Sequence, residues 1–211
     1  MANRNDDREY IEGQVAALKK SLEFFSNKCK PPREKWVVNE LLEYLQIETT
    51  SDEVRSSEDE PPDIVFRDFR FEIKEILDNG RKRTAEYKAS LAKAEQATDA
   101  SSLLELYTPI KLPIANVLVR VLSEAKQWNA KYPTSVRQGL DLLIYLNLQG
   151  TTIIGSGLPS AIVLEIAALG WRSLSVVSNN CALIVAATEK APSFLHALVG
   201  RILAKKNRTS N

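Results

Sequence analysis

The chain has 211 residues, 44% hydrophobic and 26% charged, a length and composition that suit one domain with an ordinary buried core. Its 28 basic and 27 acidic residues give a net charge of +1, so the composition lacks the basic excess that most nucleic-acid-binding proteins carry. Two cysteines and one histidine exclude zinc fingers and histidine-rich zinc sites, while the polar start and the short apolar runs favour a cytoplasmic protein without membrane spans.

Two helices are predicted before the first strand. Across residues 6–27 apolar side chains recur every three or four positions, which predicts an amphipathic helix and makes residues 1–30 an N-terminal helical extension. A second helix is predicted over residues 33–46, after Pro31-Pro32. Glu34 lies at the same helical angle as the apolar stripe of that helix, so we expect its carboxylate to face inward. There it either interacts favourably with the helix N-terminus or joins an acidic site.

Residues 48–62 are polar and acidic, and we expect a mobile loop there. An edge strand inside this loop is compatible with the sequence, although no pattern predicts one. Two strands follow, over residues 63–66 and 69–77. Because side chains alternate along a strand, Glu72 and Lys74 share one face of the second strand, and the other face is mainly apolar. If the two strands pair, the carboxylate of Asp63 reaches the same end of the sheet as Glu72.

Two converging carboxylates form a hard oxygen site that suits Mg²⁺ or Mn²⁺. A neighbouring ammonium group can stabilise charge on a phosphate or help to deprotonate a water molecule. These groups together suit metal-assisted hydrolysis of phosphodiester bonds. Short motifs recur by chance, however, and the same residues also fit a β-hairpin with Glu72 and Lys74 solvated side by side.

One sequence motif resembles that of the PD-(D/E)XK nuclease superfamily, which has the restriction-endonuclease-like fold. The motif consists of Pro62-Asp63, then eight residues, then Glu72-Ile73-Lys74. The resemblance implies that Asp63, Glu72 and the carbonyl of Ile73 bind the metal, and that Lys74 assists the attacking water. It also implies that Glu34 completes the acidic cluster. The whole chain is similar to a small family of uncharacterised bacterial proteins described as endonucleases.

After the second strand, Asp78-Asn79-Gly80 predicts a turn and a polar helix follows to about residue 98. The cations that open this helix, Arg81, Lys82 and Arg83, are predicted to contact phosphates; a solvated helix start is the alternative. Further helices are expected at 103–107, 114–131, 161–169 and 193–204, strands at 140–148, 171–178 and 181–188, and a frayed basic tail at 205–211.

These elements predict an α/β protein in which helices flank a mixed central sheet, with residues 1–211 as a single nuclease-like domain. The order is compatible with an α-β-β-β-α-β restriction-endonuclease-like core that carries an added N-terminal helix and a helical insertion. The first strand of that core is not evident. Gly155 to Ser160 form a glycine-rich turn, and His196 is expected to pack, partly buried, on the last helix.

The sequence therefore predicts a Mg²⁺- or Mn²⁺-dependent endonuclease that acts on nucleic acid, with DNA as the expected partner and a homodimer left open. The first alternative is a non-catalytic, nuclease-like binding or assembly module in which the acids and Lys74 form an internal ion pair. The near-neutral net charge favours this alternative. The second alternative is a nucleotide-binding protein that uses the turn from Gly155 to Ser160.

Overall fold

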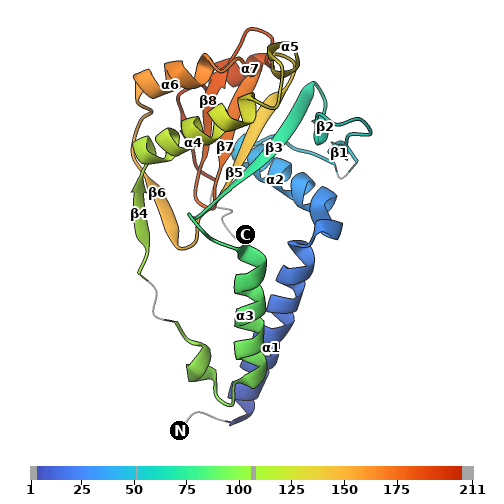
Figure 1. Ribbon diagram of the computed structural model, residues 1–211, viewed down its shortest axis with the longest axis vertical. Helices are drawn as coiled ribbons and strands as arrows, with labels where there is room; N and C mark the ends of the chain where they lie inside the picture. The colour runs from blue at the N-terminus through green and yellow to red at the C-terminus, as the bar shows by residue number, and fades with distance from the viewer. Residues whose placement is uncertain (1–3, 51, 106–107, 206–211) are drawn as a thin grey trace. The chain divides into compact units, whose positions relative to one another are not determined.

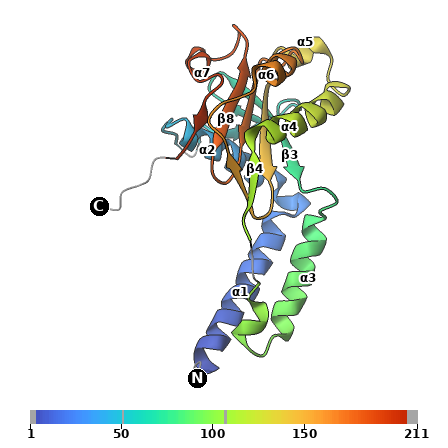
Figure 2. The same ribbon diagram turned by 90° about the vertical axis from the view of Figure 1, so that its left-hand side faces the viewer.

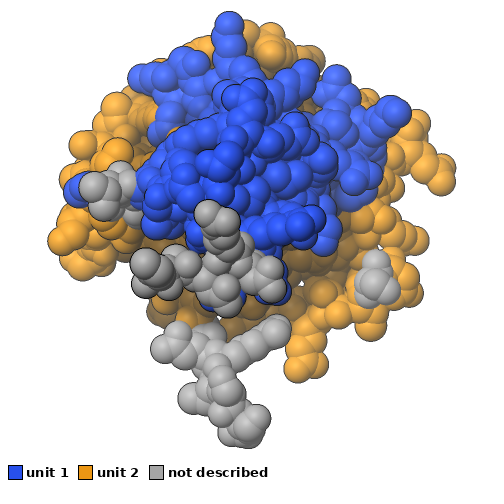
Figure 3. Space-filling view, turned by 90° about the horizontal axis from the view of Figure 1, so that it is seen from below, with its two compact units in different colours: residues 1–33, 78–108 blue, residues 34–77, 109–211 orange. Residues whose placement is uncertain are grey.

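The computed structural model describes residues 4–50, 52–105 and 108–205. The chain folds into two compact units, and each unit draws on segments that are far apart in the sequence. Unit 1 contains residues 1–33 and 78–108, and unit 2 contains residues 34–77 and 109–211. Figure 3 colours unit 1 blue and unit 2 orange. All the paired strands of the described residues belong to unit 2.

Unit 1 is helical. Helices α1 (Arg4–Phe24) and α3 (Arg83–Gln96) lie side by side (Figures 1 and 2) and are accompanied by the short 3-10 helices η1 (Asn27–Cys29) and η2 (Ala100–Leu103). An ion pair of 3.0 Å joins Lys19 to Glu95, and Phe25 stacks on Tyr87 with 5.5 Å between ring centroids. The apolar stripe predicted for the first helix is half-buried.

Unit 2 is built on a mixed seven-stranded sheet with the strand order β1-β2-β3-β5-β7-β8-β9. Strands β3, β5 and β7 are parallel, and the other neighbours pair antiparallel. The predicted α/β fold with a mixed central sheet is therefore confirmed. The strands are β1 (Arg55–Ser56), β2 (Ile64–Phe66), β3 (Phe69–Leu77), β5 (Asp141–Asn147), β7 (Ser173–Val177), β8 (Ala182–Ala187) and β9 (Ile202–Leu203).

Each face of the sheet has its own apolar core. Helices α4 (Ile114–Asn129) and α6 (Ser160–Ala167) cover one face, where Ile76, Leu142 and Ile144 are buried. Helices α2 (Lys30–Tyr44) and α7 (Ser193–His196) cover the other face, where Phe71 and Leu143 are buried (Figure 2). Residues that alternate along β3 and β5 therefore face different helices.

A second, two-stranded sheet pairs β4 (Ile110–Pro113) with β6 (Thr151–Ile154) in parallel. The glycine-rich turn follows β6 directly. Gly155 has φ +142°, and a Cβ atom there would lie 2.8 Å from Cγ2 of Ile114. Glycine at this position therefore allows the chain to approach α4 closely. This close approach accounts for the glycine, and no bound nucleotide is needed to explain it.

The order α2, β1, β2, β3, α4, β5 supplies the predicted α-β-β-β-α-β core. Its first strand, which the sequence does not reveal, is β1 inside the acidic segment 48–62. The predicted helix at 193–204 is wrong beyond His196, because Gly200 adopts φ +81° and Ile202 then pairs with Leu183 on the edge of β8. The helix predicted at 103–107 is instead the 3-10 turn η2, and residues 106–107 lie outside the described residues.

The expected basic tail begins with an anchored residue. The ammonium group of Lys205 lies 2.7 Å from carboxylate oxygens of both Glu40 and Glu43, and residues 206–211 lie outside the described residues.

Across the part of the chain that the structure describes, no helix is both long enough and apolar enough to pass through a membrane. The short helix α5 (Thr134–Arg137) completes the elements of unit 2.

Candidate active site at the β2–β3 hairpin

The β2–β3 hairpin brings Asp63 to the segment Glu72-Ile73-Lys74. Ile64 pairs with Phe71, and the amide of Asp63 donates to the carbonyl of Phe71 at 2.9 Å. Beyond this point the side chain of Asp63 continues the pairing, because its Oδ2 accepts a hydrogen bond of 2.8 Å from the amide of Ile73. The carboxylate thus occupies the place that a backbone carbonyl of a longer β2 would take.

Glu72 is a buried carboxylate with two donors on one oxygen. Its exposed fraction is 4%, and that of Asp63 is 8%. Oε1 of Glu72 accepts a short hydrogen bond from the ammonium group of Lys74 and one of 2.5 Å from the hydroxyl of Tyr132. Oε2 receives no hydrogen bond from any described residue. Buried carboxylates are costly unless they are paired, and Lys74 and Tyr132 together satisfy this one.

The charge state of Lys74 follows from its surroundings. Burial lowers the pKa of its ammonium group, but the hydrogen bond and the negative charge of Glu72, with a smaller effect of Tyr132, raise that pKa above its usual value. Burial and the hydrogen bond to Glu72 likewise raise the pKa of the Tyr132 hydroxyl. In this arrangement Lys74 is a fixed cation and Tyr132 a neutral donor.

Tyr132 is the member of this cluster that sequence reasoning misses. It follows α4, and its ring packs edge-to-face on Trp171 with 5.5 Å between centroids. Arg137 holds the same turn by donating to the carbonyls of Tyr132, Asn129 (3.2 Å) and Leu169 (2.9 Å). No local pattern could connect Tyr132 to Glu72, because the two are separated by 60 residues and meet only in the folded sheet.

The position of Glu34 follows from the sheet face that α2 covers. It is half-buried near the start of α2, and the predicted apolar stripe of that helix is buried as expected. That stripe packs on the sheet face that contains Phe71, whereas Glu72 points to the opposite face. Among the described residues no three His, Cys, Asp or Glu side chains are placed to hold a metal ion. A place for Glu34 in an acidic cluster stays a prediction.

The three predicted phosphate-binding cations have different surroundings in unit 1. Nε of Arg81 lies 2.6 Å from Glu86, and the guanidinium of Arg83 lies 3.9 Å from the ring centroid of Phe25. Lys82 alone of the three is exposed. Two of the three cations therefore have contacts inside the protein.

His196 is exposed, not partly buried, and its Nε2 lies 2.8 Å from the carbonyl oxygen of Thr188.

The fold and this cluster define an α/β protein with two buried carboxylates and a lysine on its central hairpin. The chain belongs to the family described as "putative endonuclease, protein of unknown function (DUF1780)", whose profile matches residues 6–210. No curated protein matched the sequence.

A solved structure from Pseudomonas aeruginosa strain PAO1 is similar, with a TM-score of 0.65 and 23% identity over 98% of this chain and 97% of that chain. That protein is described as one of unknown function in a monooxygenase superfamily. At this level of identity the likeness establishes a shared fold.

Proposed function

We propose that the protein is a Mg²⁺- or Mn²⁺-dependent endonuclease of the PD-(D/E)XK type, with DNA as its substrate. The observation that carries the proposal is the meeting of Asp63 with Glu72-Ile73-Lys74 on one hairpin, through the 2.8 Å bond from the amide of Ile73 to Asp63. The family description, "putative endonuclease, protein of unknown function", points to the same reaction class.

The donor set fits a small, hard cation. Both acids offer oxygen ligands, and Oε2 of Glu72 receives no hydrogen bond within the described part of the chain. Mg²⁺ commonly binds through one or two carboxylates and keeps several water molecules and substrate oxygens as its other ligands, so a third acid is not required. Asp63, Glu72 and the carbonyl of Ile73 would hold the cation, which would supply Lewis acidity and lower the pKa of a bound water.

The residues of the chain then have distinct roles. The ammonium group of Lys74, held beside Glu72, supplies a positive charge that stabilises the negative charge developing on the phosphate. Lys74 also neutralises Glu72 when no cation is present. The hydroxyl of Tyr132 keeps the carboxylate of Glu72 in one orientation by donating to Oε1. Tyr132 is therefore a positioning residue.

A cleavage assay tests this proposal. Wild-type protein with Mg²⁺ or Mn²⁺ should cleave at least one of linear, circular, single-stranded or branched DNA, or RNA. Lys74→Ala should abolish cleavage, and Lys74→Arg should restore little, because guanidinium differs from ammonium in shape and in the bonds it forms. Lys111→Ala is the matched control, since Lys111 is exposed on β4 of the same unit and should leave cleavage intact.

The second candidate is a non-catalytic module that keeps the fold of a nuclease. It is favoured by the closed ion pair between Glu72 and Lys74 and by the absence of a three-acid group among the described residues. This candidate would be supported if folded wild-type protein bound Mn²⁺ but cleaved none of these substrates under the same conditions. Cleavage that survives Lys74→Ala would instead point to a different site.

A further inference from the structure

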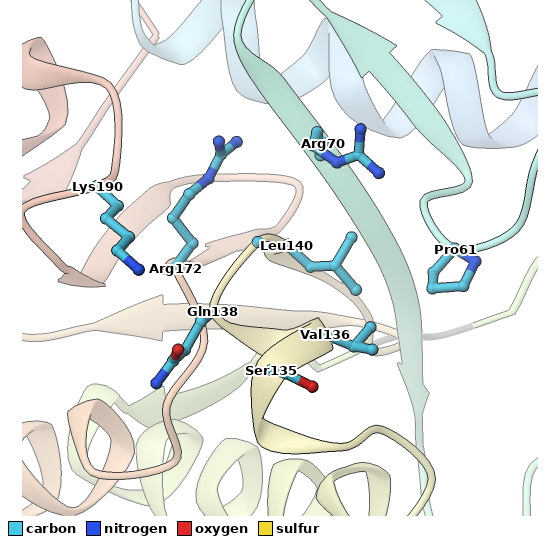
Figure 4. A pocket seen from close by; sticks show the side chains of 9 residues that line it. Pro61, Arg70, Ser135, Val136, Gln138, Leu140, Arg172 and Lys190 are labelled. Carbon is cyan, nitrogen blue, oxygen red and sulfur yellow. The ribbon is translucent and has the colours of Figure 1, made fainter.

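A pocket of about 620 Å³ opens in unit 2 at the amino ends of the three parallel strands (Figure 4). Arg70 contributes from β3, Leu140 immediately precedes β5, and Arg172 immediately precedes β7. Lys190 lines the pocket from the segment after β8. In the view of Figure 4, Arg172 lies between Lys190 and Arg70. Of the described residues that line the pocket, three are cationic and none is acidic.

A buried acid next to the pocket fixes one of these cations. Asp141, only 1% exposed, accepts hydrogen bonds from Nε of Arg172 (3.0 Å), from Nη2 of Arg172, from the hydroxyl of Ser173 (2.7 Å) and from the amide of Arg70 (2.9 Å). Nη2 of Arg172 also donates to the carbonyl of Asp68 at 2.7 Å. The Nη1 amine of Arg172 has no acceptor among the described residues, which leaves two N–H donors for a ligand.

Neither of the other two cations is paired with an acid among the described residues. The side chains of Arg70 and Lys190 are both exposed, and no described carboxylate forms an ion pair with either of them. Glu189 lines a neighbouring hollow of about 300 Å³, which shares Gln138 and Lys190 with the first pocket. Counting Asp141, the pocket holds three positive charges and one negative charge. Such a surplus, presented by guanidinium and ammonium groups, suits a phosphate.

The pocket adjoins the candidate active site along both strands of the hairpin. Arg70 precedes Glu72 by two residues on the same face of β3, which corresponds to about 6.6 Å at roughly 3.3 Å per residue. Pro61, which also lines the pocket, precedes Asp63 by two residues. A nucleic acid strand held at Asp63 and Glu72 would therefore present a neighbouring phosphate to Arg70.

We propose that this pocket binds a phosphate group of the nucleic acid strand next to the bond that is cleaved, with Arg70, Lys190 and Nη1 of Arg172 as its contacts. The proposal rests on the proposed nuclease function and adds how the strand is held. The phosphate can come from two sources. An internal phosphodiester carries one negative charge, whereas a terminal phosphate carries about −1.5 to −2 charges at neutral pH.

Binding measured without divalent cations separates this proposal from catalysis. Fluorescence anisotropy in EDTA would follow a labelled single-stranded oligonucleotide bound to wild-type protein, to the double variant Arg70→Gln/Lys190→Gln and to the control Lys111→Gln, which removes one exposed positive charge outside the pocket. The double variant should bind at least about tenfold more weakly, and the control should match wild type within about twofold. The slope of log affinity against log salt should fall by about 1.4 for two lost contacts to a single strand.

Three competitors distinguish the two sources of phosphate: a 5′-phosphorylated strand, the same strand with a 5′-hydroxyl group, and a circular single strand. Tighter binding of the phosphorylated strand, lost in the double variant, assigns a terminal phosphate. Equal binding of all three assigns an internal phosphodiester.

The proposal is overturned if the folded double variant binds as the control does, or if wild-type protein binds none of the strands. Binding is measured without divalent cations and cleavage with them, so wild-type protein that binds the strand in EDTA but does not cleave it would count against the nuclease proposal and not against the pocket.

Discussion

Replacing Lys74 with methionine should destabilise the protein in the absence of divalent cations. The side chain of Glu72 is 5% exposed and that of Lys74 is 23% exposed, so the substitution removes the charge partner of a nearly buried carboxylate. Breaking a fully buried pair costs about 3–5 kcal/mol. Here the hydroxyl of Tyr132 still donates to Glu72, and some water reaches Lys74, so we expect a loss of about 2–3 kcal/mol.

The assay is urea denaturation in EDTA and again in Mn²⁺. If Glu72 binds the cation, Mn²⁺ at one hundred times its dissociation constant should add about 2.7 kcal/mol to the stability of the variant, because only the folded state holds both carboxylates together. Lys111→Met controls for loss of an exposed lysine and should change stability by less than about 0.5 kcal/mol. Equal stability of the two variants in EDTA would refute the reasoning that Glu72 depends on Lys74.

Three further substitutions test individual contacts. Tyr132→Phe removes one hydrogen bond to a charged acceptor and should cost about 1.5–3 kcal/mol in urea denaturation, against little change for the exposed Tyr10→Phe. Asp141→Asn leaves the arginine beside it without its buried charge partner, and a loss of about 3–5 kcal/mol is expected; a loss below about 1 kcal/mol would contradict the pairing. On α4, Leu118→Ala should cost about 2–5 kcal/mol and the 56% exposed Val119→Ala less than about 0.5 kcal/mol in the same assay, whereas similar losses would contradict the assigned faces of the helix.

The hairpin could be predicted from the sequence because its signals are local. Alternation from Phe69 to Leu77 assigns Phe71 to one face of the strand and Glu72 to the other. Because the loop between the two strands is short, the strands are expected to pair antiparallel. Strand β1 could not be predicted in this way. It has two exposed residues in an acidic segment and is defined only by its pairing with β2.

Helical periodicity has a similar limit at Glu34. It fixes the angle of Glu34 relative to the apolar stripe of α2, but it does not say which face of the sheet the helix covers. Because α2 covers the face of Phe71, an inward-facing Glu34 need not approach Glu72.

The ion pair of Asp141 with Arg172 could not be predicted from the sequence for a related reason. It depends on β5 and β7 being neighbours, with Asp141 in register with Ser173.

The most direct test of the central claim is a Mn²⁺ titration by calorimetry. Wild-type protein should bind Mn²⁺ through oxygen ligands alone, and Asp63→Asn and Glu72→Gln should each weaken binding by at least about tenfold, because each variant removes one of two charged ligands. Asp63→Asn can keep the hydrogen bond from the amide of Ile73, so its hairpin should stay intact. Asp59→Asn, an exposed acid of the preceding loop, should bind as wild type does. Unchanged Mn²⁺ affinity in Asp63→Asn would contradict the assignment of Asp63 and Glu72 as a cation site.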